Sequence, residues 1–416
     1  MTLVPGVGHI PETWDTQRAK WLMNRERRST NTTDQVVTAF RDGRVTLRAN
    51  RRLDGFTEAV QEIGYQGIRN GDLVVHSMDG FAGAIGVSDS DGKASPVVHA
   101  YTPKPRTDLR YYAYILRQMA LNGRITSLAK GIRERSTAFD APTLANLVLP
   151  LPPLEEQRRI ADFLDAETVR IGKAVETMRR QENLLAERRH HILDLSLEQT
   201  QDAPRFRLGY ATTLVTSGSR GWGTYATDSG ALFFRSANLH SDSIQPKLSS
   251  VTYVSLPKEA IVEATRSRIQ IGDVLIGITG ANAGWVALAN NDVADGYVSQ
   301  HVCLTRPETH KIDSEWLAFL IASPSTQRGL MESQYGGTKT QLSLPDIRNI
   351  QVPSISLNRQ REVAREIKRQ VRLVDRQRRL RRRQTELLGE RREALITAAV
   401  TGQFDVSTAS GRGVTE

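Results

Sequence analysis

The stretch that decides the fold is PLPPLEEQRRIADFLDAETVRIGKAVETMRRQENLLAERRHHIL, residues 150–193, because the chain repeats it 203 residues later. The second copy is PSISLNRQREVAREIKRQVRLVDRQRRLRRRQTELLGERREALI, residues 353–396, and the two copies align without a gap. Identical pairs include Leu154/Leu357, Gln157/Gln360, Ala161/Ala364, Gln181/Gln384, Leu185/Leu388 and Arg189/Arg392. A match of this length within one chain indicates a tandem repeat.

Both copies are rich in Glu, Arg, Gln, Leu and Ala, which favour helices, so each copy predicts one long helix of about 60 Å at 1.5 Å per residue. A stripe at alternating spacings of four and three residues runs from Ile160 to Leu195 and from Val363 to Ala398. This stripe predicts a coiled-coil-like, antiparallel pair. Its register would be set by the polar stripe members Gln181, Arg188, Gln384 and Arg391. In the alternative interpretation, each helix packs only on its neighbouring domain.

The repeat continues more weakly upstream of each predicted helix. The segment 71–75, GDLVV, recurs as GDVLI at 272–276, which predicts a turn followed by a buried strand in each copy. Aromatic-rich segments at 109–116 and 315–321 predict short buried helices. The expected fold class is therefore α+β, with two mixed domains and two long helices in a tandem pseudo-repeat.

Composition narrows the compartment and the partners. The 416 residues suffice for two or three domains, and the single cysteine, Cys303, excludes an intrachain disulfide and a cysteine-based zinc site. Without an apolar run of membrane length or a signal segment, we expect a cytoplasmic protein. The net charge is +10, and residues 359–392 hold 14 basic and 5 acidic residues. This segment would attract phosphate or acidic protein, or it is simply a solvated helix face.

The sequence lacks the catalytic motifs of methyltransferases and nucleotide-binding enzymes. The only Pro-Pro pair, Pro152-Pro153, lacks the Asn or Asp before it and the aromatic residue after it that an amine methyltransferase would show. Gly280–Gly284 is followed by Trp285 rather than Lys, so no phosphate-binding loop is present. Asp346, Glu366 and Lys368 match the loose pattern of metal-dependent nucleases, but the last two lie inside the second predicted helix. A nuclease stays as the alternative from the enzyme class, and a coiled-coil scaffold without DNA binding as the structural one.

Several motifs resemble those of the specificity subunit of type I restriction-modification systems, and the resemblance covers essentially the whole chain. They are LPLPPLEEQ at 149–157, ALITAAVTGQ at 394–403, NGDLV at 70–74, GAIGVS at 83–88, Ser95-Pro96, SGSRGW at 217–222 and QHV at 300–302. The domains implied are target recognition domain 1 at 1–149, helical spacer 1 at 150–203, target recognition domain 2 at 204–352, helical spacer 2 at 353–402 and a flexible tail at 403–416.

The resemblance implies a noncatalytic subunit in which each recognition domain reads half of a bipartite DNA target. The helices would set the spacing between the half-sites and dock two methyltransferase subunits, which restriction and translocase subunits would join. S-adenosylmethionine, ATP and Mg²⁺ would belong to those partners, with no cofactor in this chain. The expected docking residues are Leu154, Gln157, Ile160, Leu164, Leu185, Leu357, Gln360, Val363 and Leu388.

Side-chain chemistry selects the candidate DNA contacts, since Arg, Asn and Gln bond to base edges and Lys and Ser mostly contact phosphate. In the first domain they are Arg44, Arg48, Asn50, Arg51, Arg52, Lys104 and Arg106. In the second they are Ser219, Arg220, Trp222, Tyr225, Lys339, Thr340 and Gln341. Trp222 as a core anchor, Arg220 in a surface ion pair and 336–341 as a plain turn are the alternatives. For Gln300 and His301 a structural role is favoured.

The target itself is expected to be asymmetric, because the two domains share only a weak frame and their candidate reading loops differ. Half-sites about 10 bp apart, centre to centre, would suit two domains on one face of a duplex.

Overall fold

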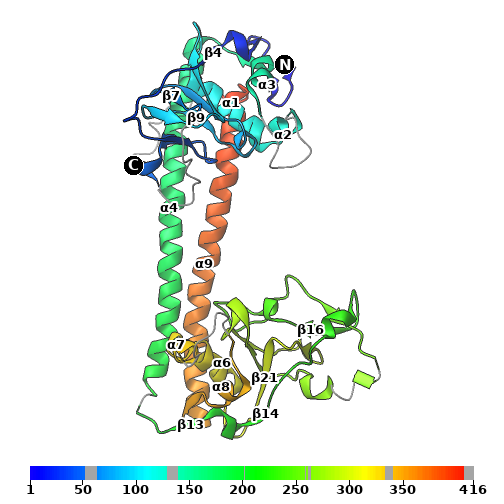
Figure 1. Ribbon diagram of the computed structural model, residues 1–416. Helices are drawn as coiled ribbons and strands as arrows, with labels where there is room; N and C mark the ends of the chain where they lie inside the picture. The colour runs from blue at the N-terminus through cyan, green and yellow to red at the C-terminus, as the bar shows by residue number, and fades with distance from the viewer. Residues whose placement is uncertain are drawn as a thin grey trace. The chain divides into compact units, whose positions relative to one another are not determined.

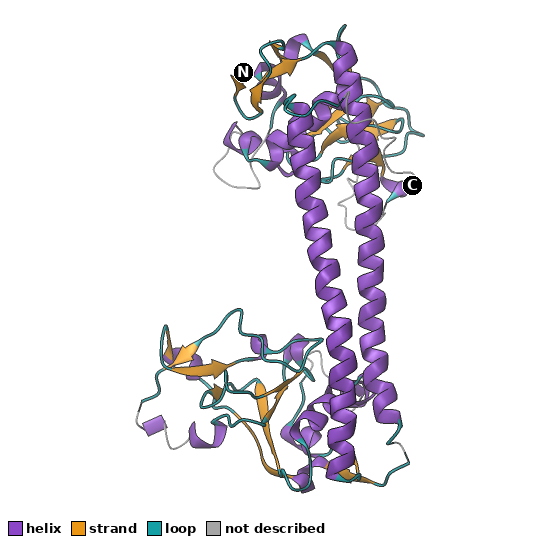
Figure 2. Cartoon of the chain, turned by 180° about the vertical axis from the view of Figure 1, so that it is seen from behind, coloured by secondary structure: helices purple, strands orange, loops and turns teal. Residues whose placement is uncertain are grey.

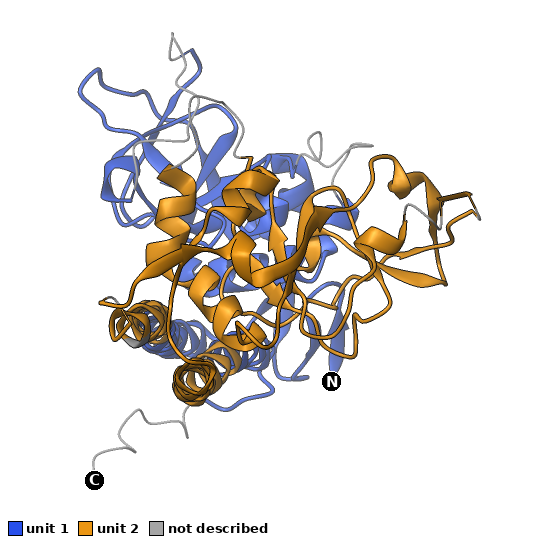
Figure 3. Ribbon diagram, turned by 90° about the horizontal axis from the view of Figure 1, so that it is seen from below, with its two compact units in different colours: residues 1–177, 384–416 blue, residues 178–383 orange. Residues whose placement is uncertain are grey.

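The computed structural model describes residues 1–51, 63–128, 139–200, 202–257, 259–260, 264–332 and 341–406. The chain forms two compact units (Figure 3). Unit 1 consists of residues 1–177 and 384–416, and unit 2 of residues 178–383. The predicted domain boundaries divide the sequence differently, because each compact unit takes part of both long helices together with a sheet. Those boundaries stay a prediction.

Both repeated segments form one long helix each, as predicted (Figures 1 and 2). The first is α4 (Leu154–Glu198) and the second is α9 (Leu357–Val400). Unit 1 contains the beginning of α4 and the end of α9, whereas unit 2 contains the end of α4 and the beginning of α9. Within the described part of the chain, no helix combines the length and the apolar character that crossing a bilayer requires.

Unit 1 is built on a four-stranded antiparallel sheet in the order β4 (Met23–Glu26), β11 (Val98–Pro103), β8 (Leu73–His76) and β9 (Ile85–Val87). Helix α1 (Leu109–Leu121) packs on β8 and β9. Smaller elements are β1 (Thr2–Val4), β2 (Gly8–Ile10), β3 (Asp15–Arg18), β5 (Val37–Ala39), β6 (Val45–Leu47), β7 (Gln66–Ile68), β10 (Gly92–Ala94), α2 (Arg124–Leu128), α3 (Ala141–Asn146) and β12 (Val148–Leu151).

Unit 2 has a sheet with the equivalent order, β14 (Thr212–Ser217), β21 (Val302–Pro307), β18 (Val274–Gly277) and β19 (Val286–Leu288). Helix α6 (Ser314–Ala322) packs on β18 and β19. Other elements are β13 (Arg205–Arg207), β15 (Ala226–Thr227), β16 (Ala231–Phe234), β17 (Tyr253–Val254), β20 (Tyr297–Val298), α7 (Pro324–Glu332), α8 (Leu344–Arg348) and β22 (Gln351–Pro353). The repeat seen in the sequence is therefore a repeat of topology.

The Gly-Asp pairs explain why the weak upstream repeat survives in both units. Gly71 and Gly272 have φ angles of 88° and 87°, a left-handed turn that favours glycine. The following Asp72 and Asp273 are buried, and each carboxylate accepts a backbone N–H and pairs with an arginine. Strands β8 and β18 begin directly after them, so the predicted turn and buried strand are confirmed.

Two glutamines fasten the long helices to the domain helices. Gln157 is fully buried, its Oε1 accepts the N–H of Asp108 at 2.9 Å, and its Nε2 donates to the carbonyls of Arg106 and Pro152. Gln360 repeats this pattern, with Oε1 accepting the N–H of Asp313 at 2.7 Å. Asp108 and Asp313 cap α1 and α6. Each long helix therefore begins against the start of a buried domain helix.

Ion pairs show that the helices run antiparallel within unit 2. Glu182 of α4 pairs with Arg378 and Arg382 of α9, and Arg189 lies 3.6 Å from Asp375. Residue numbers rise along α4 as they fall along α9, so the predicted antiparallel pair is confirmed.

The polar seam was predicted at the wrong residues. The four polar stripe members Gln181, Arg188, Gln384 and Arg391 are all exposed, and Leu195 is 44% exposed. The polar residues buried where the helices pair are instead Arg189, only 3% exposed and about 100° further around α4 than Arg188, and Arg378 of α9, 9% exposed. The reason is that α4 packs on the domain core through Ile192 and Leu193 as well as on α9, which makes its buried face wider than a two-helix seam. The alternative interpretation, in which each helix packs only on its neighbouring domain, is therefore wrong for α4, because α4 packs on the domain core and also contacts α9.

Candidate nucleic-acid interface

Each unit has a hollow at the corresponding end of its four-stranded sheet. In each repeat, one central strand ends there and its neighbour begins. In unit 1, the hollow of about 740 Å³ includes His76 at the end of β8 and Val98 at the start of β11. In unit 2, the hollow of about 460 Å³ includes Ser299, Gln300 and His301, directly before β21. We refer to them as the unit 1 hollow and the unit 2 hollow.

The unit 1 hollow is lined by part of the predicted basic cluster. Arg48 donates from Nε to Thr38 Oγ1 at 3.4 Å. Arg51 pairs with Asp42 at 2.9 Å and lies over the ring of Phe40, 4.3 Å from its centroid. These contacts hold both guanidinium groups at the wall of the hollow. Arg52 lies outside the described residues.

Other members of the cluster sit around the hollow rather than in it. Arg44 is exposed in the turn between β5 and β6, and the side chain of Asn50 donates to Thr46 Oγ1 at 2.9 Å. Arg41, which is not among the sequence candidates, lines the hollow and pairs with Asp79 at 2.8 Å. The sequence pattern could have indicated this residue, because Arg41-Asp42-Gly43 is a turn between two alternating apolar segments.

Lys104 and Arg106 lie elsewhere in unit 1. Lys104 follows the far end of β11, where its Nζ donates to the carbonyl of Lys20 and lies 5.4 Å from the ring centroid of the exposed Trp21. Arg106 adopts a φ of 73°, and its carbonyl accepts from Gln157. The six residues of β11 therefore separate these two basic residues from the unit 1 hollow.

In unit 2 the loop before β15 lines the hollow. Ser219 and Trp222 form part of its wall, and Trp222 is 4% exposed with its ring edge-on to Tyr297 at 5.8 Å. The core-anchor interpretation of Trp222 is therefore correct. Arg220 is exposed, and among the described residues no acidic group pairs with it. Tyr225 is 38% exposed at the end of the same loop.

The structure brings Gln300, His301 and Gln341 to one edge. His301 Nδ1 lies 2.7 Å from Thr279 Oγ1, and its Nε2 lies 3.0 Å from Gln300 Nε2. Thr279 in turn forms an isolated antiparallel bridge with Gln341. Lys339 and Thr340 lie outside the described residues. The position of Gln300 and His301 between β20 and β21 gave no clue to this convergence, because it depends on how distant segments pack.

Three buried polar atoms at the unit 2 hollow lack an intramolecular partner within the described part of the chain. They are Arg235 Nε, Ser299 Oγ and Gln300 Oε1. Buried polar atoms are nearly always hydrogen-bonded, so these three atoms can bond to water or to a polar group of a ligand at the unit 2 hollow.

Comparison with known families identifies the family to which this chain, with its two hollows, belongs. The family model described as "Type I restriction modification DNA specificity domain" matches residues 50–176 and 236–386, more than half of the chain. The chain belongs to this type I DNA specificity family. The resemblance read from the sequence is thereby confirmed.

Known relatives of the specificity family agree at low identity. The specificity subunit of the type I restriction enzyme EcoBI of Escherichia coli is 22% identical over 251 residues, covering 54% of this chain and 52% of that protein. The chain thus matches about half the length of this curated relative.

Solved structures show the same fold. A chain from a study of complex assembly and conformational transition of the type I R-M system has a TM-score of 0.69 at 17% identity, covering 95% of this chain and 99% of the other. The HsdS subunit of Thermoanaerobacter tengcongensis gives 0.52 at 18% identity, covering 95% and 98%. At these identities the likeness concerns the fold, and it confirms the two mixed domains with two long helices.

In this specificity-family chain, the expected docking residues divide by burial. Buried in the cores of their own units are Gln157, Ile160, Leu164, Gln360 and Val363. Partly buried are Leu154, Leu185, Leu357 and Leu388. The large apolar side chains that the long helices expose are instead Val169, Leu184, Leu195, Leu373, Leu380 and Leu387.

The nuclease pattern is not assembled in unit 2. Asp346 caps α8 with Ser343, the carboxylate of Glu366 accepts from Arg369 and Gln370, and the ammonium of Lys368 pairs with Glu315 at 2.6 Å. Across the residues the structure describes, no group of three His, Cys, Asp or Glu side chains is arranged to hold a metal ion. Each member of the pattern therefore has a local structural partner.

Proposed function

We propose that this chain is the noncatalytic DNA-recognition subunit of a type I restriction-modification complex, with each unit reading one half of an asymmetric, bipartite target. The observation that carries the proposal is the pair of hollows at equivalent sheet edges. The same strand order places them, but different side chains line them: arginines in unit 1, and a Ser-Gln-His edge with a Trp-containing loop in unit 2. Equivalent placement with different chemistry suits the reading of two different half-sites.

The proposed DNA contacts are the sequence candidates that lie near these hollows, together with Arg41, Arg235, Gln300 and His301. Arg220 is the leading base reader in unit 2, because it is exposed beside the hollow and no described acidic group neutralises it. The exposed side chains of Arg44 and Gln341 are suited to contact DNA at the rims of the unit 1 and unit 2 hollows.

The proposed partners are two methyltransferase subunits and the restriction and translocase subunits, in the cytoplasm. S-adenosylmethionine, ATP and Mg²⁺ would bind to those partner subunits. In unit 2, α9 exposes Leu373 and Leu380, one heptad apart and 57% and 56% accessible. Leu184 on α4 and its repeat equivalent Leu387 on α9 are exposed as well. Exposed leucines at heptad spacing suit the docking of partner helices.

The test is to express the chain with its methyltransferase subunit in a host that lacks methylation and to map methylated adenines across the genome. We expect one bipartite motif with unequal halves and a fixed gap, and no methylation from either protein alone. A continuous or palindromic motif would contradict the asymmetric reading. Adenine methylation by this chain alone would refute the noncatalytic assignment.

The same preparation tests the two alternatives. Mg²⁺-dependent cleavage by the purified chain, abolished in Glu366→Ala, would favour a nuclease. An assembled complex that leaves no footprint on DNA would favour a coiled-coil scaffold without DNA binding.

A further inference from the structure

Arg378 of α9 is a largely buried cation that meets carboxylates from two other parts of unit 2. It is 9% exposed, and its Nη1 donates to Asp242 Oδ2 at 2.7 Å. Its Nη2 lies 3.9 Å from Glu182 Oε1 of α4. Asp242 belongs to neither long helix, because it lies between β16 and β17. The Arg378–Asp242 ion pair therefore joins the two long helices to the rest of unit 2.

Asp242 lies in a loop, residues 239–246, that Asn238 closes at its base. Asn238 is 1% exposed, and its Nδ2 donates to the carbonyl of Lys247 at 2.9 Å. Its own carbonyl accepts the N–H of Lys247 at 2.8 Å, and its Oδ1 accepts the N–H of Arg235 at 3.0 Å. These bonds hold the two ends of the loop together and tie them to Arg235. We call residues 239–246 the helix-contact loop.

The helix-contact loop begins at the wall of the unit 2 hollow. Arg235, Ser236 and Ala237, which directly precede Asn238, all line the hollow. Further along, Ile244 is 4% exposed and shares a hydrophobic core with Val374 of α9. One short stretch of chain therefore lines the hollow at its start and packs on the long helices near its middle. The ion pair of Asp242 holds this stretch from the side that faces away from the hollow wall.

Unit 1 cannot form the same ion pair. The repeat aligns Arg378 of α9 with Val175 of α4, whose side chain carries no charge. It also aligns Asp375, which lies 3.6 Å from Arg189 in unit 2, with Gly172. The link between the long helices and the wall of a hollow is therefore specific to unit 2, and any effect it has on DNA reading should concern one half-site only.

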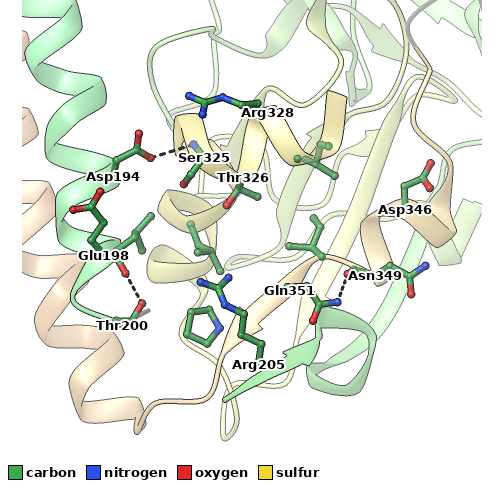
Figure 4. Close-up of a pocket in the computed structure, with 16 residues that line it drawn as sticks. Asp194, Glu198, Thr200, Arg205, Ser325, Thr326, Arg328, Asp346, Asn349 and Gln351 are labelled. Carbon is green, nitrogen blue, oxygen red and sulfur yellow. Dashed lines mark hydrogen bonds between the residues drawn. The ribbon is translucent and has the colours of Figure 1, made fainter. Parts of the chain in front are cut away.

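Two other contacts join the long helices to the rest of unit 2 away from the hollow. Asp194 of α4 accepts the N–H of Ser325 at 3.1 Å beside a cavity of about 640 Å³ (Figure 4). None of the described residues that line this cavity also lines the unit 2 hollow. Lys368 of α9 pairs with Glu315 of α6 at 2.6 Å. These contacts resemble the Arg378–Asp242 pair in kind but involve no residue of the hollow wall, so they provide matched controls.

We propose that Asp242 and Arg378 are positioning residues for the half-site that unit 2 reads: their ion pair fixes the hollow wall at 235–237 and so determines how strictly unit 2 discriminates between bases. Neither residue lines the hollow, so each acts through the helix-contact loop. A binding site discriminates well only when the residues behind it hold it in one geometry. Without the ion pair, the wall can adapt to more than one base. The proposal rests on the proposed function in taking the unit 2 hollow as a DNA-reading site.

The test uses the full-length chain assembled with its methyltransferase subunit. For each variant, kcat/KM for methylation is measured on the mapped target and on duplexes with one changed base pair in either half-site, and the ratio of the two values is the discrimination. Asp242→Ala should lower the discrimination by about 3- to 30-fold in one half-site only. That half-site should be the one affected by Arg235→Ala, a change in the hollow wall itself. Asp242→Glu, which keeps the carboxylate, should retain most of the discrimination.

The remaining variants separate positioning from stability. Asp242→Ala/Arg378→Met removes both charges and leaves neither one unpaired, so it should show the same loss of discrimination even where its melting temperature returns towards that of the parent. The controls Asp194→Ala and Lys368→Ala each remove a contact between a long helix and the rest of unit 2. They should leave the discrimination in both half-sites within about twofold of the parent.

A purely structural role for the ion pair gives a different result and would overturn the proposal. In that case Asp242→Ala lowers the melting temperature and the activity on every duplex, but the discrimination stays unchanged. Equal loss of discrimination in both half-sites would overturn it as well. The parent complex separates the two levels of the argument. If it methylates a bipartite motif and the ratios of Asp242→Ala do not move, this inference alone fails, whereas a parent without such a motif contradicts the proposed function too.

Discussion

At the scale of single residues, two buried glutamine side chains make the same contacts at equivalent positions of the two repeats. Gln157 and Gln360 each satisfy three backbone groups with one amide. Gln157→Ala or Gln360→Ala leaves those groups unpaired inside the protein, so each should lower the free energy of unfolding by about 2–3 kcal/mol. Gln181→Ala, at an exposed glutamine of α4, should stay within about 0.5 kcal/mol. Urea unfolding followed by circular dichroism measures all three, and equal losses would refute the role of the buried amides.

Arg220 is the residue whose loss should separate the two half-sites. If it reads a base edge, Arg220→Ala should cost about 1–3 kcal/mol and relax specificity in one half-site only. Methylation mapping of the variant complex checks this, with Arg207→Ala as the control at another exposed arginine of unit 2. Relaxation of both halves, or a uniform drop with no change of motif, would exclude base reading.

His99 gives unit 1 a dependence on pH. Burial, together with the nearby charges of Arg25 and Arg27, lowers the pKa of His99 to about 4. The unfolded histidine titrates near 6.5, so the unfolded state binds the proton first as the pH falls. The stability contributed by neutral His99 is therefore complete above pH 6.5 and lost between pH 6.5 and about 4. His99→Phe should flatten the loss of unfolding free energy over this window, whereas His190→Phe, at an exposed histidine, should not.

At the scale of elements, α4 and α9 each pass from one unit into the other. Because they pair antiparallel, shortening one helix alone would misalign Glu182 with Arg378 and Arg382. Deleting 174–177 from α4 together with 384–387 from α9 removes about one turn from each and nearly preserves the helix faces. We expect unchanged half-sites with a changed gap in the methylated motif.

A matched pair of two-residue deletions, 176–177 with 384–385, is the control for that experiment. It rotates the remaining helix by about 200°, so it should destabilise the protein far more. The spacer role fails if the four-residue deletions keep full activity on the original gap, or if they alter the bases recognised.

At the scale of the whole molecule, the positive charge is concentrated in one segment, where ion pairs neutralise part of it. Most of the net charge of +10 arises in residues 359–392. Several of these cations pair with acidic residues from outside the segment: Arg361 with Asp313, Lys368 with Glu315, Arg378 with Asp242 and Arg382 with Glu182. Outside this segment the chain carries a net charge of only +1, so the two domains hold little excess positive charge to bind phosphate.

The chain alone should therefore bind DNA weakly. We expect a Kd weaker than about 10⁻⁶ M near 0.15 M salt, the range of nonspecific binding, and at least about 100-fold tighter binding to the methylated motif once the methyltransferase subunits are present. Fluorescence anisotropy with the mapped site and a scrambled duplex measures both. Tight, specific binding of DNA by the isolated chain would contradict this prediction, because the methyltransferase subunits would then not be needed for affinity.

The sequence by itself determined the elements and their repetition. Local signals sufficed for α4 and α9, for the Gly-Asp turns at Gly71 and Gly272 and for the buried helices α1 and α6, because helix propensity, turn geometry and apolar periodicity act between residues close in the chain. Only the tertiary structure decided which side chains meet. Arg189 replaced Arg188 in the helix interface because α4 packs on a third surface, and Gln300, His301 and the Trp222 loop converged because β18, β21 and a distant loop end at one edge. Such convergence depends on contacts between residues tens to hundreds of positions apart, and no local pattern in the sequence encodes it.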